Sequence, residues 1–194
     1  MSTVLALKQF INTLSPISES TWGQIEPLFA HSTLKKGGYF IKDGQLATQF
    51  AFLGSGVIRG YYQDTFGAEY NKHFFIAPSI VGGYTSLITG QPNRIIQQAL
   101  TDCVLMQADY TAFISLYDSF PDLERVGRRF AELYFVEKEQ KEIELVLLSA
   151  EKRYQLFQKR YPGLEQQISQ YHIASYLGIT PTQLSRIRKK WAQL

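Results

Sequence analysis

The chain has 194 residues, is 45% hydrophobic and 19% charged, and carries a formal net charge of +3. These values are typical of one large or two small globular domains with an ample core. A single cysteine, Cys103, excludes an intrachain disulfide and a four-cysteine metal site. Because no signal segment opens the chain and no apolar run approaches the roughly eighteen residues of a membrane span, we expect a cytoplasmic protein without a membrane partner.

Two helices are predicted in the first thirty residues. Apolar residues recur at helical spacing up to Leu14, Pro16 interrupts the pattern, and Ser18 can cap a second helix. The apolar positions are Val4, Leu5, Leu7, Phe10, Ile11 and Leu14 in the first helix, and Trp22, Ile25, Leu28 and Phe29 in the second.

From Thr33 to about Asp109 the sequence favours strands. Short runs rich in β-branched and aromatic residues alternate with glycine-containing turns. The predicted strands are 39–42, 49–53, 57–62, 69–76 and 97–106. Many short strands with glycine turns indicate an antiparallel barrel or jelly roll.

A long helix is predicted over 122–147, which contains no proline. The apolar residues Leu123, Val126, Phe130 and Leu133 repeat at the spacing of a coiled-coil seam, so we expect this helix to pair with its copy in a homodimer. The alternative is that the helix only packs along its own domain. Four polar residues, Glu137, Gln140, Lys141 and Glu144, weaken the seam in its second half.

The next helix should run from 150 to 161, with Ser149 as its cap and Pro162 after its end. Residues 148–149 are therefore the expected hinge between the part of the chain that contains the strands and the part that follows.

Residues 168–190 have the pattern of a helix-turn-helix. Ala174 is small where two helices must cross, and Gly178 allows the left-handed backbone of the turn. Thr180 can cap the second helix, in which Pro181 occupies the first turn. The apolar positions that point between the helices are Ile173, Leu177, Ile179, Leu184 and Ile187.

The positive charge of the chain lies at this end. Residues 151–194 hold eight Lys or Arg and two Glu, a balance of +6, whereas residues 1–150 hold twelve basic and fifteen acidic residues, a balance of −3. Such asymmetry is typical of a surface that binds DNA. The DNA-contact residues that we predict are Ser169, Tyr171, Thr180, Thr182, Gln183, Ser185, Arg186, Lys189 and Lys190. Arg186 is the candidate for guanine, with Gln183 and Thr182 as secondary readers.

The order of helices, β-roll, long helix and helix-turn-helix resembles the Crp/Fnr family of bacterial transcription regulators over nearly the whole chain. Gly44 and Gly56 lie at the separation of the family's glycine turns, and residues 82–94 resemble its phosphate-binding cassette. The resemblance implies an α+β fold with a double-stranded β-helix (jelly-roll-like) effector domain at 1–120. A dimerisation helix at 121–148 and a winged-helix-like helix-turn-helix domain at 149–194 would follow, with any wing drawn from 162–168.

The same resemblance implies a homodimeric transcription regulator that binds an inverted repeat in double-stranded DNA, with RNA polymerase as a further partner. The implied effector-binding residues are Gly82, Gly83, Tyr84, Thr85, Ser86 and Arg94. Gly83 or Tyr84 stands where the family places the glutamate that binds ribose, and Ile95 follows the arginine instead of a small hydroxyl residue. These departures count against a cyclic nucleotide as cofactor, so a different small effector, or none, is expected. Arg94 has an alternative role in a surface ion pair.

Other functions fit the sequence less well. His31, His73 and His172 lie far apart, and no catalytic or metal-ligating constellation is visible, so we predict no enzyme and no metal site. A ligand-binding module whose helix-turn-helix makes only protein contacts is the main alternative, which the charge of +6 disfavours. A β-roll enzyme with an appended helical domain is the third.

Overall fold

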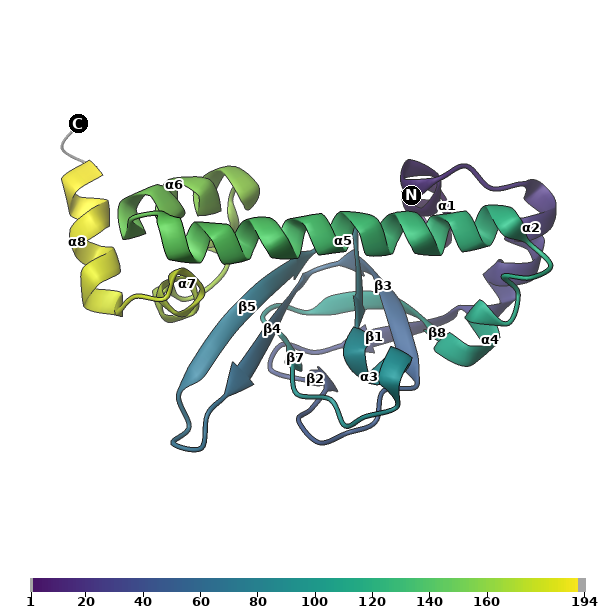
Figure 1. Ribbon diagram of the computed structural model, residues 1–194, viewed down its shortest axis with the longest axis horizontal. Coiled ribbons are helices and arrows are strands. Elements are labelled where there is room, and N and C mark those ends of the chain that lie inside the picture. Colours follow the sequence, from purple (N-terminus) through teal and green to yellow (C-terminus); the bar gives the residue numbers. More distant parts are fainter. Residues whose placement is uncertain (1, 192–194) are drawn as a thin grey trace. The chain divides into compact units, whose positions relative to one another are not determined.

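The computed structural model describes residues 2–191 and shows an α+β protein with two antiparallel sheets and a long helix (Figure 1). The chain forms two compact units. The first is built from the residues up to Gly60 and from Phe74–Tyr134, and the second from Tyr61–His73 and the residues after Tyr134. Within the described residues, no helix is both long and apolar enough to cross a membrane.

The strands form a roll of two four-stranded sheets, which confirms the predicted jelly-roll architecture. The first sheet has the order β1 (Ala30–Leu34), β8 (Cys103–Asp109), β3 (Gln49–Ser55), β6 (Ser79–Gly82). The second has the order β2 (Tyr39–Ile41), β7 (Ile96–Ala99), β4 (Val57–Gln63), β5 (Glu69–Ile76). A short helix, α3 (Tyr84–Thr89), follows β6.

The expected strand at 97–106 is wrong as a single element, because residues 100–102 separate β7 from β8. The chain passes close to Gly56 at this break: the φ of Gly56 is +98°, and a Cβ there would lie 2.5 Å from the carbonyl oxygen of Asp102. Two strands, β1 and β6, have no counterpart in the prediction. β1 is mostly exposed and carries little apolar signal, and its pairing with β8 determines its conformation.

Helices cover one face of the first sheet. The two helices predicted near the N-terminus are confirmed as α1 (Thr3–Leu14) and α2 (Glu19–Ile25), the latter followed by a 3-10 turn. Ser18 caps α2 by accepting a hydrogen bond from the Thr21 N–H at 3.0 Å. Phe52 and Met106 from the sheet pack with these helices, with α4 (Tyr110–Ile114) and with the first turns of α5 (Pro121–Leu147).

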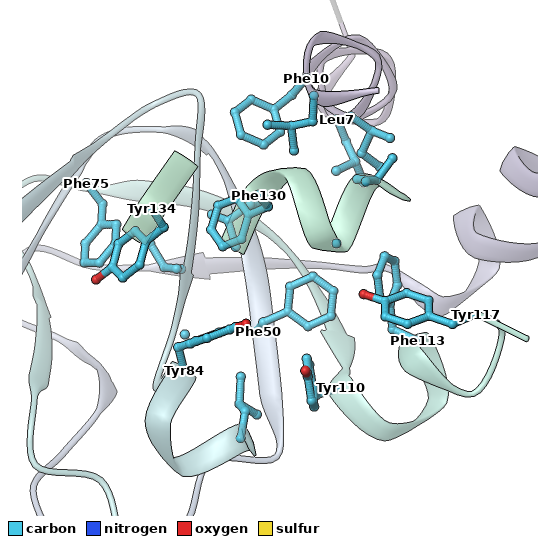
Figure 2. A pocket seen from close by; sticks show the side chains of 18 residues that line it. Leu7, Phe10, Phe50, Phe75, Tyr84, Tyr110, Phe113, Tyr117, Phe130 and Tyr134 are labelled. Carbon is cyan, nitrogen blue, oxygen red and sulfur yellow. The ribbon is translucent and has the colours of Figure 1, made fainter. Parts of the chain in front are cut away.

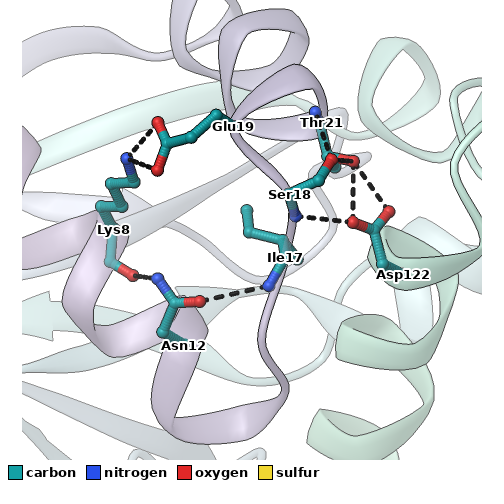
Figure 3. A network of polar contacts seen from close by, with 7 residues as sticks. All are labelled: Lys8, Asn12, Ile17, Ser18, Glu19, Thr21 and Asp122. Carbon is teal, nitrogen blue, oxygen red and sulfur yellow. Dashed lines mark hydrogen bonds and ion pairs between the residues drawn. The ribbon is translucent and has the colours of Figure 1, made fainter.

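The start of α5 is tied to the α1–α2 segment by a polar network (Figure 3). The Asp122 carboxylate accepts hydrogen bonds from the Ser18 N–H and the Thr21 hydroxyl, each at 2.8 Å. A nearby ion pair joins Lys8 to Glu19 at 2.7 Å. Because these residues come from three helices, the network fixes the position of the first turn of α5 within its unit.

The coiled-coil seam predicted on α5 is wrong for three of its four residues, and only Leu133 is exposed. Leu123 and Val126 are buried in the core of their own unit. Phe130 lines a cavity in that unit. The exposed apolar side chains of α5 begin at Leu133 instead. The coiled-coil spacing is also the spacing of a helix that packs on its own domain, and the sequence alone does not distinguish the two.

The second unit contains the rest of α5, then α6 (Ala150–Arg160), a 3-10 turn (Leu164–Gln166), α7 (Gln170–Leu177) and α8 (Pro181–Trp191). Ser149 caps α6 as predicted, by accepting a hydrogen bond from the Lys152 N–H at 3.3 Å. Residues 162–168 form turns around the 3-10 segment rather than strands, so the wing expected there is not formed. The tip of the β4–β5 hairpin belongs to this unit.

Candidate nucleic-acid interface and ligand cavity

The core of the helix-turn-helix forms as the sequence predicts. Ala174 is fully buried where α7 and α8 meet, and Gly178 adopts a left-handed backbone with φ +67°. The Ile179 N–H donates to the Ala174 carbonyl at 3.0 Å, which ends α7. Thr180 accepts a hydrogen bond from the Gln183 N–H at 3.1 Å and so caps α8. The other buried residues between the helices are Ile173, Leu177, Leu184 and Ile187.

The outer face of α8 is polar and basic. The predicted contact residues that are exposed are Ser169, Tyr171, Thr180, Thr182, Gln183, Arg186, Lys189 and Lys190, while Ser185 is half-buried. Helical spacing places Arg186 beside Thr182, Gln183, Lys189 and Lys190 on one face. In the part of the chain that the structure describes, no ion pair engages Arg186 or Lys189. These cations are therefore available to phosphates and base edges.

Buried polar contacts hold α7 in place within its unit. Arg153 donates to the carbonyl of Leu177, the last residue of α7, at 3.1 Å, and to the Leu148 carbonyl at 2.6 Å. Lys141 donates to the Tyr176 carbonyl at 3.3 Å. Cations at the C-terminus of a helix neutralise its partial negative charge. The sequence gives no sign of these contacts, because the partners lie 24 and 35 positions apart.

The tip of the β4–β5 hairpin binds directly to α7. The Asn71 N–H donates to the Ser175 hydroxyl at 3.0 Å, and that hydroxyl donates to the Glu69 carbonyl at 2.8 Å. The Asn71 amide donates to the His172 carbonyl at 3.1 Å. Tyr70 lies against the turn glycine of the helix-turn-helix. Sequence reasoning missed this contact entirely, since residues about 100 positions apart carry it.

A histidine of this unit is kept neutral. Burial is the main cause that lowers the pKa of His73 to about 4, and the positive charges of Arg160, Lys141 and Lys72 contribute to the same shift. The Glu137 carboxylate lies 3.5 Å from Nδ1 of His73, but burial and the three cations together still lower the pKa of the imidazole. Among residues 2–191, no three His, Cys, Asp or Glu side chains are grouped to hold a metal ion.

Most residues of the predicted cassette lie at the end of β6 and on α3. Gly82 and Gly83 end β6, and the Ser86 hydroxyl is buried, where it accepts a hydrogen bond from the Ala47 N–H at 2.9 Å. A Cβ at Gly83 would lie 3.0 Å from the Asn93 amide oxygen, so a carboxylate side chain there has little room.

The other effector residues predicted in the cassette are exposed. Tyr84 and Thr85 are exposed on the first turn of α3. The Arg94 side chain is 82% exposed, and its Nε lies 3.4 Å from Asp43 Oδ1. This geometry is the surface ion pair that the sequence offers as the alternative for Arg94.

The first unit holds an apolar cavity of about 120 Å³ (Figure 2). Its walls come from α1, α3, α4 and α5 and from strands β3, β5 and β6. Most of the larger lining side chains are aromatic, with Phe50 near the middle of the group (Figure 2). Only Gly82 and Tyr84 belong both to this lining and to the predicted effector residues.

The roll, the long helix and the helix-turn-helix together define the fold of the Crp/Fnr transcription regulators. FixK2 from Bradyrhizobium japonicum is 16% identical, and the match covers 85% of each chain with a TM-score of 0.73. The c-di-GMP-responsive global regulator CLP of Xanthomonas campestris is 17% identical over 91% of this chain and 92% of that one, with a TM-score of 0.70. A protein of Eubacterium rectale assigned to the Crp/Fnr family is 14% identical over 91% and 84%, with a TM-score of 0.71.

No protein-family model and no curated protein sequence matches the chain. At these identities the structural matches establish the fold.

Proposed function

We propose that this protein is a homodimeric DNA-binding transcription regulator of the Crp/Fnr type that reads an inverted-repeat operator. The observation that carries the proposal is the exposed polar and basic face of α8, centred on Arg186, on a buried helix-turn-helix core. A recognition helix requires both features, because the core fixes its geometry and the outer face contacts base edges and phosphates.

The dimer is proposed to form along α5. Its exposed face carries apolar residues at alternating spacings of three and four, at Leu133, Val136, Ile143 and Leu147, with Gln140 at the central position. Their side chains are between 48% and 73% exposed. That spacing is a coiled-coil seam, and pairing with a second copy would bury it.

In such a dimer the two recognition helices would enter successive major grooves about 34 Å apart. Arg186 is the proposed guanine contact, since its fork of donors matches two acceptors of that base. Lys189 and Lys190 are proposed to hold phosphates. Ser169 and Tyr171, at the start of α7, would hold the neighbouring phosphates, where the free N–H groups of a helix N-terminus favour an anion.

Protein contacts alone would be a second use for the helix-turn-helix, but no observation favours it. The excess charge of +6 in residues 151–194 suits a polyanion better than a protein face. The cassette is not part of this proposal, because Arg94 and Ser86 are engaged elsewhere in their own unit.

Selection of random duplex DNA by the purified protein near physiological salt, followed by sequencing, tests the proposal. We expect an enriched inverted repeat, either without additions or with cell extract supplying an effector. A variant with Arg186, Lys189 and Lys190 changed to Ala is the matched control, since all three are exposed and should leave folding unchanged. Selection that yields no enriched sequence under either condition would overturn the proposal.

A further inference from the structure

The aromatic cavity of the first unit is large enough to hold a ligand. We propose that it binds a small uncharged aromatic molecule carrying one hydrogen-bonding group, of the size of phenol. The inference does not depend on DNA binding, since every lining residue belongs to the first unit.

The size of the cavity sets the upper limit on the ligand. Its volume is about 120 Å³. An engineered protein cavity of about 150 Å³ lined by similar side chains stays dry and binds benzene. A cavity of similar size thus matches a single small ring, and it is far too small for a nucleotide.

The lining sets the charge of the ligand. No charged side chain takes part in it. A carboxylate or ammonium placed inside would lose its hydration without gaining an ionic partner, which excludes charged ligands. The aromatic members of the lining are Phe10, Phe50, Phe75, Tyr84, Tyr110, Phe113, Tyr117, Phe130 and Tyr134.

These rings favour an aromatic guest. Phe50 meets Phe113 edge to face at 5.0 Å between centroids and Tyr110 at 6.2 Å. Phe113 continues the series with Tyr117 at 6.0 Å. Ring edges and faces presented at such angles complement the quadrupole of a further ring.

Three hydroxyls supply the polar contact. Those of Tyr84, Tyr110 and Tyr117 form no hydrogen bond with any described residue. In Figure 2 the hydroxyls of Tyr84 and Tyr117 point toward Phe50, at the middle of the lining. A tyrosine hydroxyl is neutral at physiological pH, and burial raises the pKa of Tyr110 and Tyr117 further above it. A neutral ligand hydroxyl can donate to one of them and accept from another.

Gly127 of α5 makes room for the Tyr117 side chain in the cavity wall. A glycine inside a helix costs about 1 kcal/mol relative to alanine. Here a Cβ on α5 would collide with the Tyr117 hydroxyl, so only glycine lets the hydroxyl end of that side chain come so close to the helix. The position of Tyr117 in the wall therefore depends on the missing side chain.

The cavity lies mainly on the helix side of the first sheet, and it meets the core between the two sheets at Phe75 and Val81. Phe50 and Ile80 extend from the face of the first sheet that packs against the helices. Ala51, Leu53 and Leu105 extend from the opposite face and fill the space between the two sheets. A ligand in the cavity thus lies between sheet and helices.

Calorimetric titration of the full chain with phenol tests the inference, with benzoate as the charged analogue of similar size. We expect saturable binding of phenol and binding of benzoate weakened at least tenfold. Intermolecular NOEs from phenol to the rings of Phe50, Tyr110 and Tyr117 should locate the site. Absence of saturable phenol binding, or NOEs to other residues alone, would overturn the inference.

Paired variants of α3 sharpen the test. Leu87→Trp should fill the cavity and abolish binding, whereas Ile88→Trp, at a position that is 53% exposed, should leave it unchanged. Tyr84→Phe keeps the shape of the wall and removes one hydroxyl. This variant should lower the affinity for phenol roughly threefold or more and leave the affinity for toluene unchanged. Equal phenol affinity in the wild type and in a folded Leu87→Trp variant would overturn the assignment.

Discussion

The guanidinium of Arg160 on α6 lies against the carboxylate of Glu144 on α5, with Nη1 to Oε2 at 3.1 Å and Nη2 to Oε1 at 2.5 Å. Both side chains are largely buried. The same guanidinium donates to the Tyr176 hydroxyl of α7 at 3.0 Å. One ion pair thereby joins three helices of the second unit and positions the first helix of the helix-turn-helix.

Glu144→Gln should destabilise this unit by about 2 kcal/mol, because a mostly buried guanidinium loses its ionic partner. Trp191 in α8 packs against Tyr154 of α6, so its fluorescence reports on this unit. We would follow urea unfolding by that signal in a Trp22→Phe background. Glu142→Gln, at an exposed position of α5, is the control and should change the free energy of unfolding by less than about 0.5 kcal/mol. Equal effects of the two substitutions would contradict a structural role for the pair.

Lowering the pH should decrease the stability of the second unit, because His73 becomes protonated. Its pKa is about 4 in the folded protein and near 6.5 when unfolded, so the unfolded chain binds the proton first as pH falls. The free energy of unfolding should therefore decrease between about pH 6.5 and pH 4, by up to about 3 kcal/mol from this group. Urea titrations at several pH values measure it.

His73→Gln should make the pH dependence over this window shallower. Glu137 has the opposite effect on the pH dependence. Burial raises the pKa of its carboxyl group, so the folded chain binds this proton before the unfolded chain does, and acid stabilises the fold through this group. The difference between the wild type and His73→Gln isolates the imidazole, because Glu137 and the nearby cations Lys72, Lys141 and Arg160 are common to both. An unchanged slope would show that His73 titrates normally.

Arg186 and Lys189 should affect DNA binding in different ways. Arg186→Ala is expected to remove the preference for the selected operator over random DNA, a loss of about 1–3 kcal/mol for each half-site. Lys189→Ala should weaken binding to all sequences about equally. It should also reduce the slope of log affinity against log salt concentration by about one, because one fewer phosphate is neutralised. Titrations at several salt concentrations with operator and scrambled duplexes measure both. Retention of operator preference by Arg186→Ala would assign base reading to another residue.

Ile143→Glu should prevent dimer formation, because two carboxylates would then face each other in the proposed seam. Lys138→Glu adds the same side chain to the opposite face of α5 and should leave the dimer intact. Sedimentation equilibrium of the two variants and the wild type gives the mass of each species. A wild-type monomer at micromolar concentration, or a dimer that tolerates Ile143→Glu, would place the interface elsewhere.

Local patterns in the sequence were sufficient for the helix-turn-helix. Ala174, Gly178, Thr180 and Pro181 each satisfy a requirement of the backbone within a few residues, and the structure places all four as predicted. The capped helices after Ser18 and Ser149 follow for the same reason. Glycine turns and β-branched runs likewise indicated a roll.

The tertiary structure decided what depends on distant partners. Strand β1 exists because β8 supplies its hydrogen bonds, and the apolar face of α5 divides into a buried part at Leu123 and an exposed part beginning at Leu133. The contact of Asn71 with Ser175 joins residues 104 positions apart. The aromatic cavity is assembled from seven helices and strands. Periodicity and capping are local properties that a sequence carries directly, whereas the burial of one helix face, a hairpin contact or a cavity arises only when the chain brings remote segments together.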